Sequence, residues 1–257
     1  MDPTATHGPS RSSADLVSWD GPQAFVLGGL RFGLNLGRPE TRSPSSDEEF
    51  CLVKSREFVE MYGRLEREKP QHVLELGIYQ GGSLVFFERL FRPERIVGIE
   101  LSTTPIPALD RYIERGSVIR TYMGTSQDDG RRLDEILSHE FPHGIDLIVD
   151  DASHLYQPSR RSFEICFPYL KPGGLYVLED WPWSLDSDAP AAQRGPQLPT
   201  LVCEWAVSVA SSGAIAELTV LPQATILRKS DSSGARASAD RSPPKRSPRD
   251  LLPKRFR

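Results

Sequence analysis

Carboxylate side chains cluster at the ends of two apolar runs of the sequence. One run ends in VDDASH, which contains Asp151 and His154, and the other ends in LEDW, which contains Glu179 and Asp180. If the two runs are neighbouring strands, these carboxylates meet and repel one another, and a bound hard cation stabilises such a group. Oxygen-only ligation favours Mg²⁺, Mn²⁺ or Ca²⁺ over zinc. We therefore predict a metal site formed by Asp151, Glu179 and Asp180.

His154 adds a proton acceptor to this group. Histidine readily exchanges a proton near neutral pH, and an alcohol is a better nucleophile when a positioned base removes its proton. A metal ion at the hydroxyl oxygen lowers the barrier further. A single histidine of this kind is more often a partly buried loop residue, and Glu179-Asp180 alone is a polar strand end. The two motifs together, D-x-x-H and then E-D, favour a site at which His154 is the general base.

A glycine-rich turn follows an earlier apolar run at residues 72–76. Its sequence, ELGIYQGGS, has the spacing E-x-G-x-x-x-G, in which Gly77 permits a tight turn and Gly81 lets the backbone approach a ligand. A dinucleotide fingerprint requires G-x-G-x-x-G, and a Walker phosphate loop requires a terminal Lys-Ser/Thr, so neither fits. Glu100 ends the next apolar run, where a carboxylate can accept hydrogen bonds from both hydroxyls of a ribose. These features indicate a nucleoside site, although Glu75 and Glu100 also suit ordinary strand ends.

The elements that would position these residues alternate between short apolar runs and helical segments. We predict strands at residues 72–76, 95–100, 117–122, 145–149, 175–178, 215–220 and 224–228, with a turn at 171–174. We predict helices at residues 83–91, 108–115, 128–140, 157–170 and 198–211. This alternation indicates an α/β fold with a mainly parallel sheet and helices on both faces, whose ligands bind beyond the carboxyl ends of the strands.

The preceding segment predicts one further helix. Ser46 and Glu49 have the spacing of a capping box, and a roughly helical apolar stripe follows, so the helix is expected from Ser46 to about Arg67. We expect four regions in all. These are a disordered N-terminus at 1–18, an N-terminal segment with this helix at 19–70, a ligand-binding domain at 71–228, and a disordered basic tail at 229–257.

Composition limits the class of protein. Of the 257 residues, 38% are hydrophobic and 26% are charged, which is the balance of a globular protein with one good core. No apolar run reaches the length of about 20 residues that spans a bilayer, and the N-terminus has no signal pattern. The three cysteines have no paired spacing, which argues against a disulfide framework or a zinc site. We therefore expect a cytoplasmic protein without a membrane span.

The charge is distributed unevenly along the chain. From Arg228 to the end there are ten Lys and Arg against three Asp, a formal charge of +7, so the rest carries −11 of the total of −4. An acidic body is a poor binder of nucleic acid, because phosphates are neutralised by a concentrated basic face. We predict no nucleic-acid partner and interpret the basic tail as a solvated extension. A homodimer formed through the N-terminal segment is a further hypothesis.

The turn VLELGIYQGGS resembles the first motif of the class I methyltransferases. The resemblance implies a Rossmann-like, seven-stranded sheet that binds S-adenosylmethionine (SAM). Gly77 and Gly81 would lie along the methionine part of SAM, Glu75 would lie near its amino group, and Glu100 would hold the ribose. The further cofactor candidates are Ser83, Ser126, Gln127, Asp128 and Asp150. Thr125 or Ser126 would equally serve as the N-cap of the following helix.

The segments DASHLY and LKPGGLYVLEDW are similar to those of the metal-dependent sugar O-methyltransferases related to macrocin and mycinamicin methyltransferases. Cephalosporin hydroxylase-type proteins share this pattern. The resemblance covers about residues 46–228. It implies that Asp151, Glu179 and Asp180 bind Mg²⁺ or Mn²⁺ and that His154 is the base. Macrolide-sugar enzymes often carry Asp-Asp where this chain has Glu-Asp, and some have a long additional N-terminal domain, so a macrolide acceptor is less secure.

The expected acceptor is a sugar or glycoside. A compact member of the group methylates a mannoside in mycobacterial polysaccharide biosynthesis, so a mannoside is one candidate. Trp181 and Trp183 follow the acidic pair and would stack on a sugar face, Tyr156 would form a pocket wall, and residues 184–199 would form a lid. Two alternatives stay open. A catechol-like phenol would chelate the same metal, and a non-catalytic SAM-binding protein would carry the acidic group incidentally.

Overall fold

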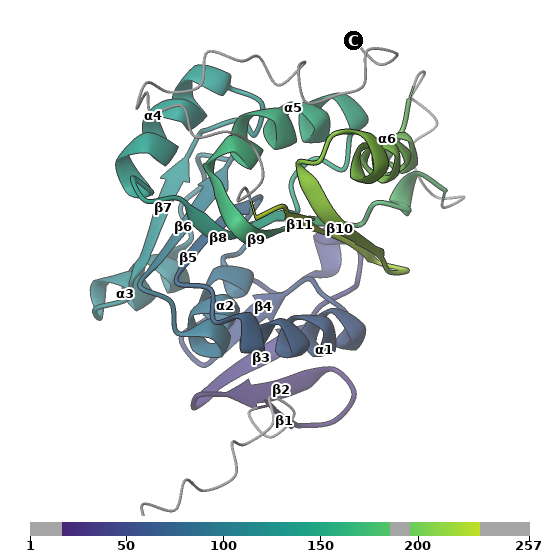
Figure 1. Cartoon of the computed structure of the whole chain (residues 1–257). Coiled ribbons are helices and arrows are strands. Elements are labelled where there is room, and N and C mark those ends of the chain that lie inside the picture. Colours follow the sequence, from purple (N-terminus) through teal and green to yellow (C-terminus); the bar gives the residue numbers. More distant parts are fainter. Residues whose placement is uncertain (1–16, 186–195, 232–257) are drawn as a thin grey trace, which may run out of the picture. The chain divides into compact units, whose positions relative to one another are not determined.

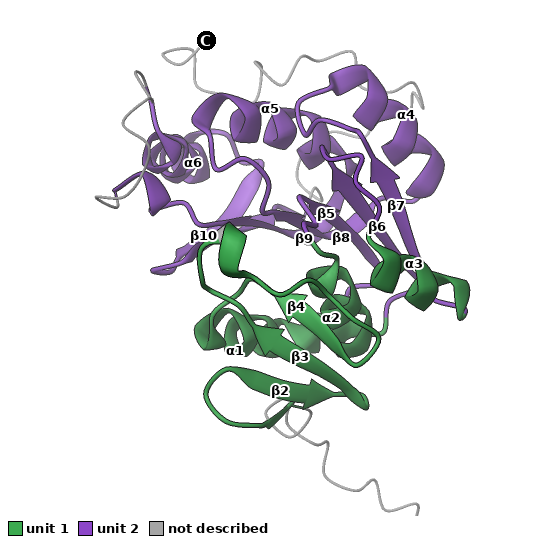
Figure 2. Ribbon diagram, turned by 180° about the vertical axis from the view of Figure 1, so that it is seen from behind, with its two compact units in different colours: residues 1–69, 80–92, 106–115 green, residues 70–79, 93–105, 116–257 purple. Residues whose placement is uncertain are grey.

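The computed structural model describes residues 17–185 and 196–231, which divide into two compact units. Unit 1 contains the residues up to 69 together with 80–92 and 106–115, and unit 2 contains residues 70–79, 93–105 and those from 116 onward (Figure 2). Residues 1–16, 186–195 and 232–257 lie outside the described residues, and with them most of the predicted disordered termini and of the predicted lid.

Unit 2 is built on a seven-stranded sheet in the order β10-β11-β9-β8-β5-β6-β7 (Figure 1). In chain order the strands are β5 (His72–Leu76), β6 (Arg95–Glu100), β7 (Ile119–Met123), β8 (Ile145–Asp150), β9 (Leu170–Glu179), β10 (Ile215–Val220) and β11 (Ala224–Lys229). The pairs among β5 to β9 are parallel, and β11 is antiparallel to both β9 and β10. The predicted α/β fold with a mainly parallel, seven-stranded sheet is confirmed.

Strand β5 determines where a ligand can bind. It is flanked by β6 on one side and by β8 on the other, so the order of the sheet reverses there. Val73 and Leu74 in β5 and Ile148 and Val149 in β8 are 0% exposed, as expected for parallel strands that are covered on both faces. In open α/β sheets the crevice for a ligand lies beyond the carboxyl ends of the strands at such a reversal.

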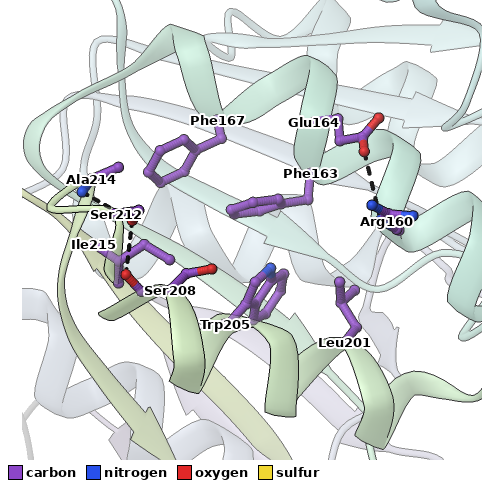
Figure 3. Close-up of a pocket in the computed structure, with 10 residues that line it drawn as sticks. All are labelled: Arg160, Phe163, Glu164, Phe167, Leu201, Trp205, Ser208, Ser212, Ala214 and Ile215. Carbon is purple, nitrogen blue, oxygen red and sulfur yellow. Dashed lines mark hydrogen bonds and ion pairs between the residues drawn. The ribbon is translucent and has the colours of Figure 1, made fainter. Parts of the chain in front are cut away.

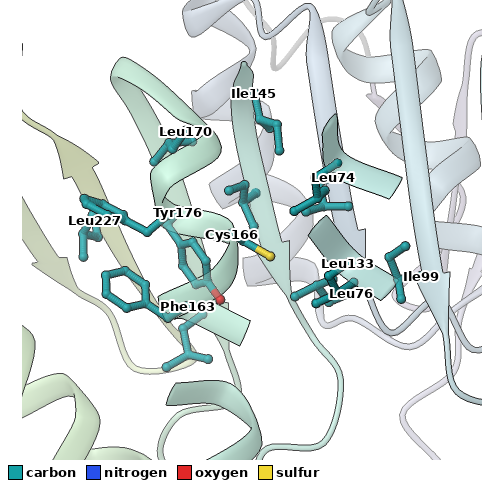
Figure 4. Close-up of a cluster of buried hydrophobic side chains, with 14 of the residues drawn as sticks. Leu74, Leu76, Ile99, Leu133, Ile145, Phe163, Cys166, Leu170, Tyr176 and Leu227 are labelled. Carbon is teal, nitrogen blue, oxygen red and sulfur yellow. The ribbon is translucent and has the colours of Figure 1, made fainter. Parts of the chain in front are cut away.

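Three helices of unit 2 lie together on one face of this sheet (Figure 1). They are α4 (Gly130–Glu140), α5 (Tyr156–Cys166) and α6 (Leu198–Ser211). The core between helices and sheet contains Phe163 and Tyr176, whose rings meet edge to face with centroids 5.2 Å apart (Figure 4). Trp205 of α6 packs on Phe163 with centroids 4.7 Å apart. Burying an apolar side chain of this size contributes about 1.5–3 kcal/mol, so this core fixes the strands that carry the site.

Unit 1 consists of a four-stranded sheet and three helices. The strands are β1 (Val17–Trp19), β2 (Ala24–Leu27), β3 (Leu30–Leu34) and β4 (Glu49–Leu52), in the order β1-β2-β3-β4. The helices are α1 (Arg56–Leu65), α2 (Gly82–Phe91) and α3 (Pro107–Glu114). Phe25, Phe32 and Phe86 are 0% exposed and form its aromatic core. The prediction assigned α2 and α3 to the domain at 71–228, whereas this division groups them with the N-terminal segment.

The predicted helix from Ser46 is wrong over its first ten residues. Ser46 Oγ does accept a hydrogen bond from the amide of Glu49 at 3.1 Å, but this turn leads into strand β4. Phe50, Cys51 and Leu52 are consecutive and all buried, which a helix with one apolar stripe cannot provide. Parallel pairing of β4 with β3 satisfies the backbone instead, and α1 begins only after Ser55.

Smaller differences concern the ends of elements. Val17 and Ser18 belong to β1 and Lys229 belongs to β11, although the disordered termini were expected to include them. Residues 171–174, predicted as a turn, lie inside β9, where the register with β8 shifts. Short 3₁₀ turns occupy Pro39–Thr41, Glu66–Glu68, Phe167–Tyr169 and Trp183–Leu185. Across the two described ranges, no helix has both the length and the apolar character that crossing a membrane requires.

Candidate active site

Two carboxylates and an imidazole meet at the carboxyl ends of β8 and β9. Asp151 follows β8 and Asp180 follows β9, and the two strands are parallel neighbours in which Asp150 is opposite Leu178. One potential ligand atom each of Asp151, His154 and Asp180 lies within 4.8 Å of the others. His154 Nε2 is 3.8 Å from Asp151 Oδ1, and their side chains are 22% and 20% exposed. These three residues therefore meet as predicted. Their side chains are partly exposed, so a small ligand can reach them.

The backbone at two of these residues is in the left-handed region. The φ angle is 54° at His154 and 51° at Asp180. Each such residue costs about 1–3 kcal/mol unless the surroundings impose it, and such residues cluster at active sites and ligand clamps. Trp183 packs against His154 with the ring centroids 5.7 Å apart in a T-shaped arrangement, which restricts the imidazole on one side. The observed strain thus supports a functional role for this corner of the fold.

Glu179 differs from the predicted arrangement. It is the last residue of β9 and is only 1% exposed, and it does not belong to the group formed by Asp151, His154 and Asp180 among the described residues. Asp180 follows the last residue of β9, and its positive φ turns the chain away from the strand direction. Its carboxylate, unlike that of Glu179, belongs to the group. The geometry therefore brings together two of the three predicted carboxylate ligands and adds the imidazole.

Glu100 organises the glycine turn at the carboxyl end of β6. Its Oε2 accepts hydrogen bonds from the amides of Ile78 and Tyr79 at 3.1 and 3.0 Å, and its Oε1 accepts one from the amide of Ser102 at 2.8 Å. A carboxylate offers about four acceptor positions, so Oε1 keeps the greater remaining capacity. One ribose hydroxyl fits this capacity without displacing an amide, and the predicted contact with both hydroxyls would require shared acceptors.

Tyr79 is a residue that the sequence motifs did not single out. It has a φ of 47° and donates its amide to Glu100. The signal was present, because Tyr79 occupies the position that a G-x-G fingerprint fills with glycine. A bulky residue rarely adopts a positive φ. Its presence here indicates that the turn requires the Tyr79 amide to point toward Glu100.

Gly77 joins the glycine turn to the acidic group. Its φ is 82°, and a Cβ built on it would overlap the carbonyl oxygen of Asp151 and lie 2.6 Å from the Cα of Ala152. The amide of Gly77 donates to Ile99 O at 2.8 Å, and the amide of Asp151 donates to Leu76 O at 2.9 Å. Only glycine allows the two chain segments to approach this closely.

Gly81 and Ser83 lie in unit 1 at the start of α2. Gly81 has a φ of 73°, and a Cβ on it would lie 2.6 Å from Leu109 Cδ2. Ser83 is in the first turn of the helix and is 8% exposed. Both remain predicted cofactor contacts, as does Glu75, which is 0% exposed within β5.

Asp150 and Gln127 form a buried polar network. Asp150 is 1% exposed and accepts hydrogen bonds from Gln127 Nε2 at 3.1 Å, Ser162 Oγ at 2.6 Å and Tyr176 OH at 2.9 Å. Burial raises the pKa of Asp150. Gln127 Oε1 accepts from the amide of Ser153 at 3.0 Å, which ties the loops after β7 and β8 together. This arrangement favours a structural role for both side chains over the predicted cofactor contact.

Ser126 and Asp128 lie in the loop after β7. Ser126 Oγ donates to Asp128 Oδ1 at 2.5 Å, and both stay predicted cofactor contacts. Helix α4 is capped by Asp129, whose carboxylate accepts from the amide of Arg132 at 3.1 Å. The alternative interpretation of Thr125 or Ser126 as this N-cap is therefore wrong.

The three predicted substrate residues have different surroundings. Tyr156 is 6% exposed and its hydroxyl donates to Glu204 Oε1 on α6 at 2.6 Å, so it joins two helices and is not a pocket wall. Trp181 Nε1 donates to Leu221 O at 2.8 Å. Trp183 is 38% exposed beside His154. Of the three, Trp183 is the one that the described geometry places at the acidic group.

A small apolar cavity between α5 and α6 is separate from this group. The rings of Phe163, Phe167 and Trp205 line it (Figure 3). Its volume of about 20 Å³ holds a single water molecule and is too small for a nucleoside or a sugar.

The chain is similar to known methyltransferases. Residues 74–181 match the family model described as a methyltransferase domain. The chain is 35% identical over 135 residues to a demethylmacrocin O-methyltransferase from Streptomyces fradiae, covering 48% of this chain and 32% of that protein. It is 34% identical over 138 residues to a mycinamicin VI 2''-O-methyltransferase from Micromonospora griseorubida, covering 51% and 32%. The chain thus spans about a third of the length of these relatives.

A solved structure shares the fold. The MycE methyltransferase from the mycinamycin biosynthetic pathway, in complex with Mg, SAH and mycinamycin VI, is 25% identical, with a TM-score of 0.56 over 71% of this chain and 52% of that one. Residues 74–181 therefore match a methyltransferase domain, and the seven-stranded sheet shares the Rossmann-like fold of the MycE methyltransferase.

Proposed function

We propose that the chain transfers a methyl group from SAM to a hydroxyl group of a sugar or glycoside, assisted by Mg²⁺ or Mn²⁺. The observation that carries the proposal is the backbone contact of Gly77 with Asp151, which joins the glycine turn to the group of Asp151, His154 and Asp180. The names of the relatives, a demethylmacrocin O-methyltransferase and a mycinamicin VI 2''-O-methyltransferase, and the Mg and SAH of the MycE complex support it.

The residues around the glycine turn fit a nucleoside cofactor. Glu100 has remaining acceptor capacity on Oε1 for a ribose hydroxyl, and Gly77 exposes backbone without a side chain. When bound, SAM supplies an electrophilic methyl group on a sulfonium. Ser126 and Asp128 of unit 2 would add further contacts, and Gly81 and Ser83 of unit 1 stay predicted cofactor contacts.

The acidic group fits a hard divalent ion. Asp151 and Asp180 offer carboxylate oxygens within 4.8 Å, in the partly buried position that lets them share a cation. These two residues would hold the ion, and Glu179 stays the predicted third carboxylate. When bound, the ion supplies Lewis acidity at the acceptor hydroxyl.

His154 would act as the general base. Its Nε2 is 3.8 Å from Asp151 Oδ1, so it would be in place to accept the proton of a hydroxyl group held beside the two carboxylates. The imidazole is also close enough to be a ligand, but carboxylate oxygens suit Mg²⁺ and imidazole suits softer ions, which favours the base. Trp183 packs on the ring and restricts its rotation. A positioned base of this kind contributes about 100- to 10,000-fold to the rate.

The first test is calorimetric titration of the full chain with SAM and with its demethylated product SAH, with and without Mg²⁺. Glu100→Gln is the variant to compare. Glu100→Ala removes the acceptor of three backbone amides and would disrupt the turn itself. Binding to the wild type that weakens in Glu100→Gln supports the cofactor assignment. Absence of binding of either compound under all conditions refutes it.

The second test is a methylation assay with glycosides and with catechols, with EDTA as the control. Mg²⁺-dependent methylation of glycosides supports the proposal. Preference for catechols favours the phenol alternative, and SAM binding without any transfer favours the non-catalytic one.

A further inference from the structure

A polar cavity of about 320 Å³ lies within unit 1, and the proposed activity gives it no role. Its lining comes from the turn between β1 and β2, from β3 and from the segment that leads into β4. The polar side chains on which its character depends are Asp20, Gln23, Arg31, Asn35 and Glu49. Pockets for small ligands begin at roughly 300 Å³, so this cavity suits a compact ligand such as a single sugar ring.

The charges in the cavity exclude anions. Arg31 Nε donates to Glu49 Oε2 at 2.6 Å, and Arg31 also donates to Asp20, so one cation is held by two carboxylates. The three side chains carry a net charge of −1, and the guanidinium is already engaged. A sulfate, phosphate or carboxylate would therefore be repelled, and a neutral or positively charged ligand would not.

The neutral groups of the cavity suit hydroxyls. The amides of Gln23 and Asn35 each offer donors and an acceptor, and the two carboxylates accept from hydroxyl donors. The Cys51 thiol also lines the cavity, and burial raises its pKa, so it adds no charge. A compact space lined by both donors and acceptors suits the hydroxyl groups of a sugar.

Cys51 connects the cavity to the start of α2. Ser45 Oγ accepts a hydrogen bond from the amide of Cys51 at 3.0 Å and donates to Gln80 O at 2.9 Å. A Cβ on Gly82 would overlap the carbonyl oxygen of Cys51. Gln80 and Gly82 flank Gly81 in the glycine turn, so a wall of the cavity rests directly on part of the proposed cofactor turn within unit 1.

We propose that this cavity binds a neutral or amino-substituted sugar ring. Binding of the sugar at this cavity does not depend on the proposed methyl transfer. Uronic acids and sugar phosphates are disfavoured by the net negative charge of Asp20, Arg31 and Glu49.

The test measures binding of three probes to the full chain in the presence of SAH, by saturation-transfer NMR and by calorimetry. The probes are a neutral methyl hexoside, the corresponding 2-amino-hexoside and the corresponding hexuronoside. We expect the first two to bind and the third not to bind. Asn35→Ala should weaken both by about tenfold, the loss expected for one hydrogen bond of about 1.4 kcal/mol. Glu49→Gln should weaken the amino sugar more than the neutral one.

A blocked variant keeps the test valid if Asn35→Ala misfolds. Gln23 is exposed at the rim, so Gln23→Cys in a Cys203→Ser background can be labelled with a bulky maleimide, since Cys51 and Cys166 are buried. The label should abolish sugar binding and leave SAH binding unchanged. Glu60→Gln on α1, whose carboxylate is paired with Arg56 at the surface, is the matched control and should change neither.

The outcomes separate the two proposals. Sugar binding that the label abolishes supports the cavity as a sugar site, and if SAH does not bind, only the methyltransferase proposal fails. Absence of sugar binding to the wild type, or equal binding to the labelled protein, overturns the cavity proposal.

Discussion

The carbonyl oxygen of Asp151 occupies the space that a Cβ on Gly77 would need, so the glycine turn and the acidic group share one contact surface. The contact lies within unit 2 and joins the end of β5 to the end of β8. It makes the spacing between the proposed cofactor turn and the proposed metal group a property of the backbone, independent of side-chain rotamers.

Gly77→Ala should therefore lose SAH affinity and stability together. The variant meets two costs, because alanine is strained at a φ of 82° and its Cβ overlaps the Asp151 backbone. We expect a loss of about 2 kcal/mol or more in the free energy of unfolding. Gly213→Ala is the control, since it has a φ of 65° and nothing within 4 Å of the added Cβ. It should lose about 1 kcal/mol and keep SAH affinity. Equal effects of the two variants in denaturant unfolding and calorimetry would contradict this explanation.

Asp180→Asn should reduce Mn²⁺ affinity more than Glu179→Gln does. Asp180 belongs to the group with Asp151 and His154, whereas Glu179 is buried at the strand end and does not. Loss of a direct ligand should cost at least about 100-fold in affinity, since even outer partners of a metal site cost about 10- to 100-fold. Electron paramagnetic resonance of free Mn²⁺ measures both. Losses of the same size would identify Glu179 as a full ligand.

His154→Gln should lower kcat by about 100- to 10,000-fold and leave SAH and Mn²⁺ binding unchanged, because a base acts only on the acceptor proton. His139→Gln is the matched control, since the His139 side chain is 75% exposed on α4. If Mn²⁺ binding is also lost in His154→Gln, the imidazole is a metal ligand and the assignment as base is wrong.

Lys229→Met should change how stability depends on pH. Lys229 Nζ donates to three backbone carbonyls, those of Phe167, Pro168 and Leu170, and burial lowers its pKa to about 8. The unfolded value is about 10.4, so between these values the unfolded chain holds the extra proton and wild-type stability rises with pH. We expect a gain on the order of 1 kcal/mol between about pH 7.5 and about pH 9.5, because solvent and the three carbonyls reduce the full effect.

The measurement for Lys229 is guanidinium unfolding of wild type and variant at both pH values. Tyrosines and other groups titrate alike in the two proteins, so the difference between them isolates Lys229. A variant whose stability rises with pH as much as that of the wild type would show that Lys229 stays charged in the fold.

The central parallel strands of unit 2 were predictable because they are buried on both faces and form nearly continuous apolar runs, as in residues 145–149. Strand β4 was not predictable in this way. The cap at Ser46 is real, but the element after it is a strand because residues 49–52 pair with β3, and local spacing does not report such pairing. A capping residue marks a turn, and tertiary contacts decide which element the turn begins.

The candidate site, like the fold, could be predicted only in part from the sequence. The predicted group contained Asp151, Glu179 and Asp180 beside His154, and the structure brings together three of these four residues, without Glu179. Asp151 and Asp180 could be predicted to meet because residues that come directly after neighbouring parallel strands lie at the same edge of the sheet. Tyr156 was misassigned because its partner Glu204 is 48 residues away on α6. Asp150 lies one residue before Asp151 but points into a buried network, and only its burial distinguishes the two.

The left-handed backbone at His154 and Asp180 also limits which substitutions evolution can sample. Glycine, asparagine, aspartate and histidine tolerate this conformation, and β-branched residues do not. A library randomised at both positions would thus be filtered twice. Selection for expression should recover a set defined by backbone geometry, and selection for turnover a smaller set defined by chemistry. Residue types that occur in the first set but not in the second are those that the backbone accepts and turnover does not. They would therefore show what catalysis alone requires at these positions.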